Sequence, residues 1–322
     1  MPIIQGQTAM ASDFSFLFGG SGSDGVLVQS SGNVNINLNG AQLFMKNYSS
    51  ISITGTGSVT FINPHANGTT IILKCKGDCT LTSSISPMLD ASKCGAIGAS
   101  SVTTNYPTGA TSGNAGTDGI GLYPAKTNKG NYQAGGALPS VPVYSAASLV
   151  TGLAAKYPWA FVGAGGASGN TDTHISGSPP DSAVSGKGGR GGGCLIIECN
   201  GAWNFTTANG ISVAGESGGN ATSTHQNGNA CASGGGGGGG GGFFGGWYRS
   251  LTANSGTVNK SGGAGGYSAP DGNASFTNSA GGGGGSVVNA GGNGSSGNSN
   301  TTAQGGAGGD GYAVVEQNSA YA

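Results

Sequence analysis

Residues 71–83 read IILKCKGDCTLTS, and a closely similar pattern returns as LIIECNGAWNFTT at residues 195–207. Aligning the two segments brings apolar residues, a cysteine, a glycine and a threonine into matching positions. The matched pairs are Ile72 with Ile196, Cys75 with Cys199, Gly77 with Gly201, Leu81 with Phe205 and Thr82 with Thr206. The chain therefore uses one short apolar segment at least twice.

A third copy lies near the end of the chain, where GYAVVEQN at residues 311–318 repeats GCLIIECN at residues 193–200. Repetition of a strand-like segment is typical of architectures in which equivalent strands stack on one another. We therefore predict an all-β protein with a stacked core, β-solenoid or β-sandwich-like, which the chain leaves twice for glycine-rich excursions. Ile72, Ile196 and Val314 are expected to face a common interior. Chance similarity within a low-complexity chain is the alternative.

Residues 26–85 carry the pattern of conventional strands. Apolar and polar side chains alternate around Val34 and Ile36, and again around Ile51 and Ile53, which is the period of half-buried strands. Turn sequences such as Asn-Gly separate these stretches. Because an Asn-Gly pair fits a hairpin and a corner between parallel strands equally well, the pattern leaves parallel and antiparallel stacking open.

Glycine dominates the rest of the chain, with 70 of 322 residues, while charged residues make up only 7%. The glycines gather in runs such as GKGGRGGG at residues 186–193 and the uninterrupted run Gly234–Gly242. Such runs fit flexible linkers. They also fit polyglycine-II-type helices, which repeat every three residues and pack closely because they lack side chains. We expect the packed helices, and one short α-helix at residues 145–157, which Ser145 can cap.

The charges nearly cancel, with 11 Lys and Arg against 12 Asp and Glu. This balance provides no basic footprint for nucleic acid or for an anionic membrane surface. No apolar run reaches the roughly 18–20 residues of a membrane span, and the first residues show no secretory signal. Low charge combined with Gly, Ser, Thr and Asn suggests an extracellular or virion-surface protein, without membrane insertion and without a nucleic-acid partner.

Six cysteines are an even number, which would fit disulfides outside the cytosol. Because Cys75 and Cys199 occupy equivalent positions, stacking of adjacent strands would bring them about 4.8 Å apart. That separation suits a disulfide between strands. Local pairing of Cys75 with Cys79 is the competing interpretation. The cysteine spacings miss those of zinc ribbons, so we predict no metal site.

The glycine runs resemble those of the receptor-binding adhesins at the tips of phage tail fibres, most closely those of T-even-like phages. In that family GGxGG motifs alternate with variable loops, and the motifs pack as a layered sandwich of left-handed helices. The resemblance covers roughly residues 186–311, through GKGGRGGG, Gly234–Gly242, GGAGG and GGAGGDG. The strand-rich first third and the six cysteines depart from this family and look more like β-solenoid surface proteins, some of which form filaments. The resemblance implies adhesion or assembly and transfers no binding residue.

Aromatic residues supply the candidate sites for binding or assembly. FFGGWY directly follows the longest glycine run, and a second group of rings precedes the glycine-rich half of the chain. The residues are Phe243, Phe244, Trp247 and Tyr248 in the first group and Tyr157, Trp159 and Phe161 in the second. We predict that both groups lie in loops, where exposed rings contact sugar rings, a receptor or another subunit. Packing over the glycine layer is the alternative.

Catalytic signatures are sparse. The three histidines lie among polar loops without the order of a catalytic triad. The acidic residues are too thinly spread for a polysaccharide lyase or hydrolase, with Asp78 and Asp90 the nearest pair in the strand region. GGAGGDGYA at residues 305–313 fits a calcium nonapeptide, but such sites need tandem copies. We therefore predict a non-enzymatic protein that needs no cofactor.

These patterns divide the chain into an N-terminal attachment segment (1–25), a strand-rich β domain (26–85), a first excursion with the helix (86–193), a repeated strand unit (194–213), a second glycine-rich excursion (214–311) and a terminal strand (312–322). We predict a structural and adhesive protein, a receptor-binding component of a phage or viral tail fibre. The alternatives are a self-polymerising subunit of an extracellular filament or surface layer and, more remotely, a polysaccharide-degrading β-helix enzyme. Expected partners are further copies of the chain, bound through free strand edges, and a cell-surface glycan or outer-surface protein.

Overall fold

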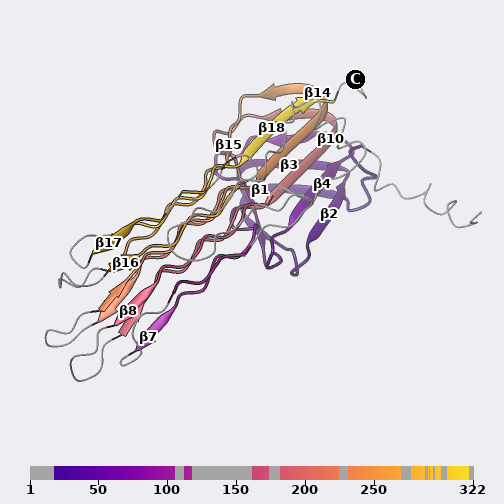
Figure 1. The fold of residues 1–322 in the computed structure, drawn as a ribbon. Helices are drawn as coiled ribbons and strands as arrows, with labels where there is room; N and C mark the ends of the chain where they lie inside the picture. The colour runs from indigo at the N-terminus through magenta and orange to yellow at the C-terminus, as the bar shows by residue number, and fades with distance from the viewer. Residues whose placement is uncertain are drawn as a thin grey trace, which may run out of the picture.

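The computed structural model describes residues 18–105, 112–117, 162–173, 182–224, 231–269, 277–286, 289, 291–292, 294–298 and 303–318. In this part of the chain every regular element is a β-strand, most of them in parallel pairs, and there is no helix. Figure 1 shows a stack of broad strands at one end and a bundle of thin extended segments running away from it to short strands at the other end. The α-helix predicted at residues 145–157 lies outside the described residues.

The stack is one 11-stranded sheet. Its longer strands are β1 (Val26–Asn37), β2 (Leu43–Tyr48), β3 (Ser50–Ile62), β4 (Thr70–Cys75), β10 (Cys194–Phe205), β14 (Phe243–Asn254) and β18 (Tyr312–Gln317). Its shorter strands are β5 (Cys79–Leu81), β6 (Leu89–Asp90), β11 (Ile211–Ser212) and β15 (Val258–Asn259). All pairings among these strands are parallel, which decides the question that the turn sequences left open.

The strands lie on one another in rows. In the first row β2, β4, β10, β14 and β18 pair in that order, so that Met45, Ile72, Ile196, Gly245 and Val314 occupy equivalent positions. In a second row β3 and the later half of β10 lie on either side of β5. In a third row β3, β6, β11 and β15 follow one another. Each pass of the chain thus adds one strand to each row it crosses.

The apolar side chains of these strands are buried on both faces of the first row. The main core cluster includes Ile51, Ile71, Leu73, Leu81, Ile197, Trp203 and Phe205. Ile72, Ile196 and Val314 belong together in a second cluster, which confirms that the three repeated segments are equivalent strands. Burying one such side chain stabilises the fold by about 1.5–3 kcal/mol, so the repeated apolar pattern accounts for the stacking.

The chain leaves the stack three times, not twice as the sequence suggested. Strands β14 and β15 interrupt the proposed excursion 214–311 and return the chain to the stack at residues 243–259. This copy escaped detection because Gly245 and Gly246 stand where β10 has Ile196 and Ile197. A Cβ atom on Gly245 would lie 2.3 Å from the Trp247 ring, so the tryptophan occupies the space of the missing side chain.

The bundle is built around the run Gly234–Gly242. Its N–H groups donate to three neighbouring segments in rotation, so that every third residue bonds to the same neighbour. The donors are Gly234, Gly237 and Gly240 toward residues 164–170, Gly236, Gly239 and Gly242 toward residues 213–219, and Gly238 and Gly241 toward residues 306–309. The N···O distances lie between 2.8 and 2.9 Å, those of ordinary backbone hydrogen bonds.

The carbonyl groups of the same run accept hydrogen bonds from three further segments. These segments are residues 186–192, 263–266 and 281–284. Backbone therefore surrounds the central run on all sides. A Cβ atom on any residue from Gly235 to Gly242 would lie 1.8–2.1 Å from a carbonyl oxygen of a neighbour, a separation that no real Cβ atom tolerates. Only glycine fits the centre of this bundle.

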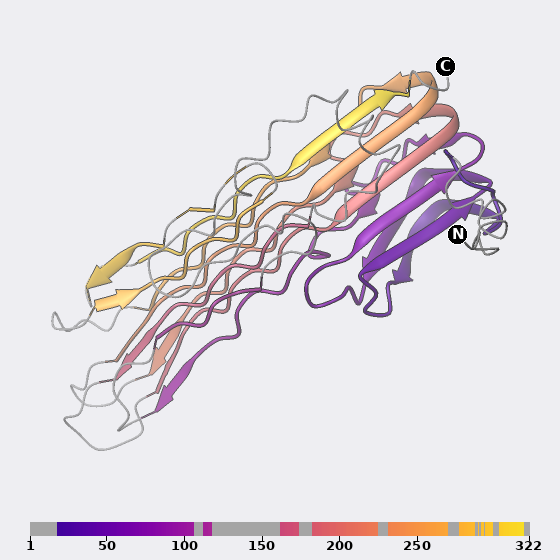
Figure 2. The same cartoon turned by 45° about the vertical axis from the view of Figure 1, so that its right-hand side comes forward.

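Short strands gather at the end of the bundle away from the stack, as Figure 2 shows from a second side. They are β7 (Thr103–Asn105), β8 (Thr171–Thr173), β9 (Ser182–Val184), β12 (Thr222–Thr224), β13 (Cys231–Ser233), β16 (Thr277–Ser279) and β17 (Ser296–Asn298). They pair antiparallel, in the order β12-β9-β7 and as the pairs β13-β8 and β16-β17. The pairs β12-β9 and β13-β8 join the second excursion to the first, whereas β7-β9 and β16-β17 each join two segments of one excursion.

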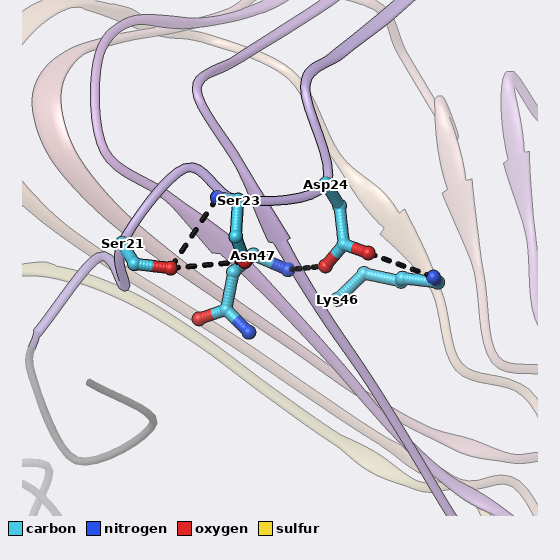
Figure 3. A network of polar contacts seen from close by, with 5 residues as sticks. All are labelled: Ser21, Ser23, Asp24, Lys46 and Asn47. Carbon is cyan, nitrogen blue, oxygen red and sulfur yellow. Dashed lines mark hydrogen bonds and ion pairs between the residues drawn. The ribbon is translucent and has the colours of Figure 1, made fainter. Parts of the chain in front are cut away.

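A polar network fastens the start of the described chain to β2 (Figure 3). The Asp24 carboxylate accepts a hydrogen bond from the Asn47 backbone N–H at 2.7 Å and forms an ion pair with Lys46 at 2.8 Å. The hydrogen bonds from Asn47 and Lys46 lower the pKa of Asp24. The Ser21 hydroxyl lies 3.0 Å from that of Ser23 and braces the preceding turn. These contacts set the position from which β1 begins.

Candidate functional site

The end of the bundle carried by the short strands is the candidate functional site. The described chain reaches this end and resumes from it five times. The intervening residues are 106–111, between β7 and the segment 112–117; 174–181, between β8 and β9; 225–230, between β12 and β13; 270–276, between the segment 260–269 and β16; and 299–302, between β17 and the segment 303–311. We call these five stretches the tip connections. The described residues on either side of each stretch lie at one pole of the molecule, remote from the stack (Figure 2).

Buried hydroxyl groups hold the strands beneath the tip connections together. The hydroxyls of Thr104 in β7 and Thr171 in β8 lie 2.5 Å apart, and both side chains are buried. The Ser233 hydroxyl donates to the Thr222 carbonyl at 3.0 Å. Each such bond contributes about 1 kcal/mol net, but an unpaired hydroxyl in the same place would be costly. These strands, which we call the platform, are therefore held by specific polar contacts between strands of the same excursion.

The described side chains of the platform are small and uncharged. Thr103 and Thr222 are exposed on one face of the β7–β9–β12 sheet, on either side of Val184. Hydroxyl groups of this kind donate and accept hydrogen bonds but do not act as nucleophiles without a nearby base. Within the residues that the structure describes, no group of three or more His, Cys, Asp or Glu side chains could hold a metal ion.

The aromatic residues Phe243, Phe244, Trp247 and Tyr248 do not form an exposed loop, and that prediction is wrong. They lie in strand β14, and between 0 and 7% of each residue is exposed. Phe243 stacks on Tyr312 of the next strand with ring centroids 6.2 Å apart, so these rings fill the core. The sequence missed this because glycines interrupt the strand pattern. The second group, Tyr157, Trp159 and Phe161, lies outside the described residues.

A buried ion pair joins β4 and β10 in the first row of strands. Lys74 Nζ is 3.2 Å from Glu198 Oε2, and the lysine side chain is fully buried. The backbone N–H of Gly19 donates to the same carboxylate oxygen at 3.2 Å. Burial raises the pKa of Glu198, and the charge of Lys74 opposes this rise. The pair therefore anchors the incoming chain at Gly19 and belongs to the structure of the stack.

Sequence alignment contained a signal for this ion pair that our prediction did not use. Lys74 and Glu198 directly precede the matched cysteines, so opposite charges stood at equivalent positions of two repeats. The hydroxyl pair of Thr104 and Thr171 left no such signal, because threonine is common throughout the chain.

Strand β1 leaves one edge without a partner among the described strands. It pairs with β3 alone, over most of its length. Val26 and Val28 are 61% and 58% exposed on this strand. Unpaired backbone groups next to exposed apolar side chains form a template for a further strand.

Cys75 and Cys199 are register partners in β4 and β10, as the alignment predicted. Both are buried, and both are free thiols in the structure.

Comparisons with protein-family models, with curated proteins and with solved structures find no match for this chain. In the described part of the chain, no helix is long and apolar enough to cross a membrane. The function must therefore be inferred from the residues themselves.

Proposed function

We propose that this protein is a non-enzymatic adhesin, a receptor-binding component of a phage or viral tail fibre, and that the tip connections bind a cell-surface glycan or outer-surface protein. The observation that carries the proposal is that the described residues on either side of all five tip connections lie at one pole. These flanking residues come from parts of the chain separated by up to about two hundred residues, and they gather on a platform far from the stack.

We infer further that the stack is a β-solenoid and the bundle a set of polyglycine-II helices. Parallel rows of strands in register support the first inference. The second is supported by the rotation of hydrogen bonds every three residues along Gly234–Gly242, which is the repeat of a polyproline-II-type helix. A bundle held by backbone alone leaves the tip connections free to change in sequence without loss of the fold.

Small uncharged groups at the platform suit recognition better than catalysis. Thr103 and Thr222 can exchange hydrogen bonds with sugar hydroxyls or with a protein backbone. An extracellular setting, such as the surface of a virion, follows from this role.

Binding of labelled full-length protein to a panel of bacterial cells tests the proposal. Replacing residues 225–230 by a Gly-Ser stretch of equal length, and each other tip connection in turn, should weaken binding at least tenfold for one or more of them. Thermal unfolding should stay unchanged. The matched control is Lys187→Gln on the exposed flank of the bundle, which should bind normally. Undiminished binding after all five replacements would refute adhesion through the tip.

Self-polymerisation is the second candidate, and the free edge of β1 favours it. A strand from another copy could pair with this edge and continue the stack. Val26→Lys together with Val28→Lys should then abolish self-association in analytical ultracentrifugation, whereas Tyr267→Lys on the bundle should not. A wild-type protein that stays monomeric at high concentration would exclude this candidate without affecting adhesion.

A further inference from the structure

Two sulfur atoms from distant parts of the chain meet inside the stack. Cys75 ends β4, and its register partner Cys199 lies in the middle of β10, 124 residues later. Both Sγ atoms are within hydrogen-bond distance of the same atom, the carbonyl oxygen of Gly77, at 3.3 and 3.4 Å. The two thiols therefore converge on one point of the core.

The backbone geometry at this point suits a covalent bond. Partners in adjacent strands of a sheet are about 4.8 Å apart, which lies within the Cα separation of disulfides. Cys79 is also buried nearby, but its register partners are Ile51 and Trp203, so no cysteine faces it across the strands. The direct pairing thus favours Cys199 over Cys79 as the partner of Cys75.

We propose that Cys75 and Cys199 form a redox site, which on oxidation becomes a disulfide that joins β4 to β10 across the whole first excursion. The two thiols lose two protons and two electrons as the S–S bond forms. A disulfide-bearing oxidant, such as oxidised glutathione or a dithiol oxidase, accepts both electrons and is released as two thiols.

The exchange passes through a mixed disulfide. The thiolate is the attacking species, so one of the two cysteines attacks the oxidant and releases its first thiol. The other cysteine then displaces the oxidant as a second thiol and closes the Cys75–Cys199 bond. Burial raises the pKa of Cys94 and of Cys194 to about 12, which keeps these two thiols inert.

Full burial of both thiols decides when the reaction takes place. An oxidant reaches them while the chain folds or when the stack opens locally, because neither side chain is exposed in the closed stack. The disulfide then closes a long loop, which restricts the unfolded chain and stabilises the folded protein.

The test uses full-length protein refolded with oxidised glutathione and, in parallel, with a reducing agent. We expect loss of two of the six thiols and a Cys75–Cys199 linked peptide in non-reducing peptide mapping. The melting temperature of the oxidised protein should be about 5–10 °C higher, and reduction should reverse the rise. Six free thiols after oxidative refolding, or a Cys75–Cys79 link, would overturn the proposal.

Variants separate the disulfide from packing effects. Cys199→Ser should remove the response of the melting temperature to reducing agent, while Cys194→Ser should preserve it. Thr70→Cys provides a positive control, because Thr70 is the register partner of Cys194 in the same two strands. If Cys199→Ser fails to fold, peptide mapping of the wild-type protein still decides the question. A response to reductant that persists in Cys199→Ser would contradict the assignment.

Discussion

Lys74 and Glu198 are register partners in β4 and β10, and their side chains form an ion pair of 3.2 Å that joins these two strands. The next register position of the same two strands holds the thiols of Cys75 and Cys199, so the ion pair and the two cysteines are adjacent. Taking charges out of water is costly, and the mutual attraction compensates only while both partners are present. The pair therefore specifies which strands become neighbours more than it adds stability.

Replacing Lys74 alone should be strongly destabilising. Lys74→Met leaves the Glu198 carboxylate in an apolar setting, so we expect a loss of about 3–5 kcal/mol in the free energy of unfolding. The double variant Lys74→Met with Glu198→Leu removes both charges and should recover most of that loss. Urea denaturation of the three proteins measures the effect. Equal losses in the single and double variants would contradict this account.

The same single variant should respond to pH in a defined direction. Burial raises the pKa of Glu198, and without Lys74 only the hydrogen bond from the Gly19 backbone N–H still opposes that rise. An acid whose pKa is higher in the folded state binds its proton more tightly there. The stability of Lys74→Met should therefore be greatest below about pH 4.5 and fall as the pH rises through the raised value. Unfolding curves between pH 4 and pH 8 test this, and Lys74→Met with Glu198→Gln is the control without the dependence.

Asp24 should contribute stability with the opposite dependence on pH. Its pKa lies below the ordinary value of 3.8, mainly because of the hydrogen bond from Asn47. The contribution is complete above that value and is lost as the pH falls toward the lowered pKa. The group is partly exposed, so the effect should stay below about 1 kcal/mol. Acid titration of stability in the wild-type protein and in Asp24→Asn measures it, and identical profiles would contradict it.

A methyl group at the centre of the bundle should prevent the bundle from folding. In Gly238→Ala the new Cβ would lie 1.9 Å from the Gly263 carbonyl oxygen, so we expect a loss above about 4 kcal/mol or no folded protein. Gly292→Ala is the matched control, since its nearest neighbour would lie 3.3 Å away. Circular dichroism and thermal unfolding compare the two. A stable Gly238→Ala protein would show that the central run is not enclosed by backbone.

The buried rings of β14 should behave as core residues. Phe244→Ala leaves a cavity in the main core cluster and should cost about 3–5 kcal/mol. The control Tyr267→Ala changes an aromatic residue that is 54% exposed on the bundle, so its effect should stay within about 0.5 kcal/mol. Thermal unfolding separates the two outcomes. A negligible effect of Phe244→Ala would show that these rings are not part of the core.

Sequence alone identified the strands that contain Ile72, Ile196 and Val314. It also placed Cys75 and Cys199 at equivalent positions of neighbouring strands. Apolar residues at equivalent positions of repeated segments face equivalent neighbours in a stack, so their spacing is a local signal that survives in the sequence. The glycine runs were equally visible, because their composition is extreme. These local signals sufficed for the all-β class and for three of the strands in the first row.

Tertiary structure alone decided the place of β14 and the direction of stacking. Gly245 and Gly246 erase the apolar pattern of that strand, and the Trp247 ring occupies the space instead, a compensation visible only in three dimensions. The enclosure of Gly234–Gly242 likewise depends on bonds such as that from Gly238 to Gly306, which join residues far apart in the chain. Hydrogen bonds between backbones do not depend on side-chain identity, so the glycine runs could not indicate which segments are neighbours or that the short strands gather at one pole.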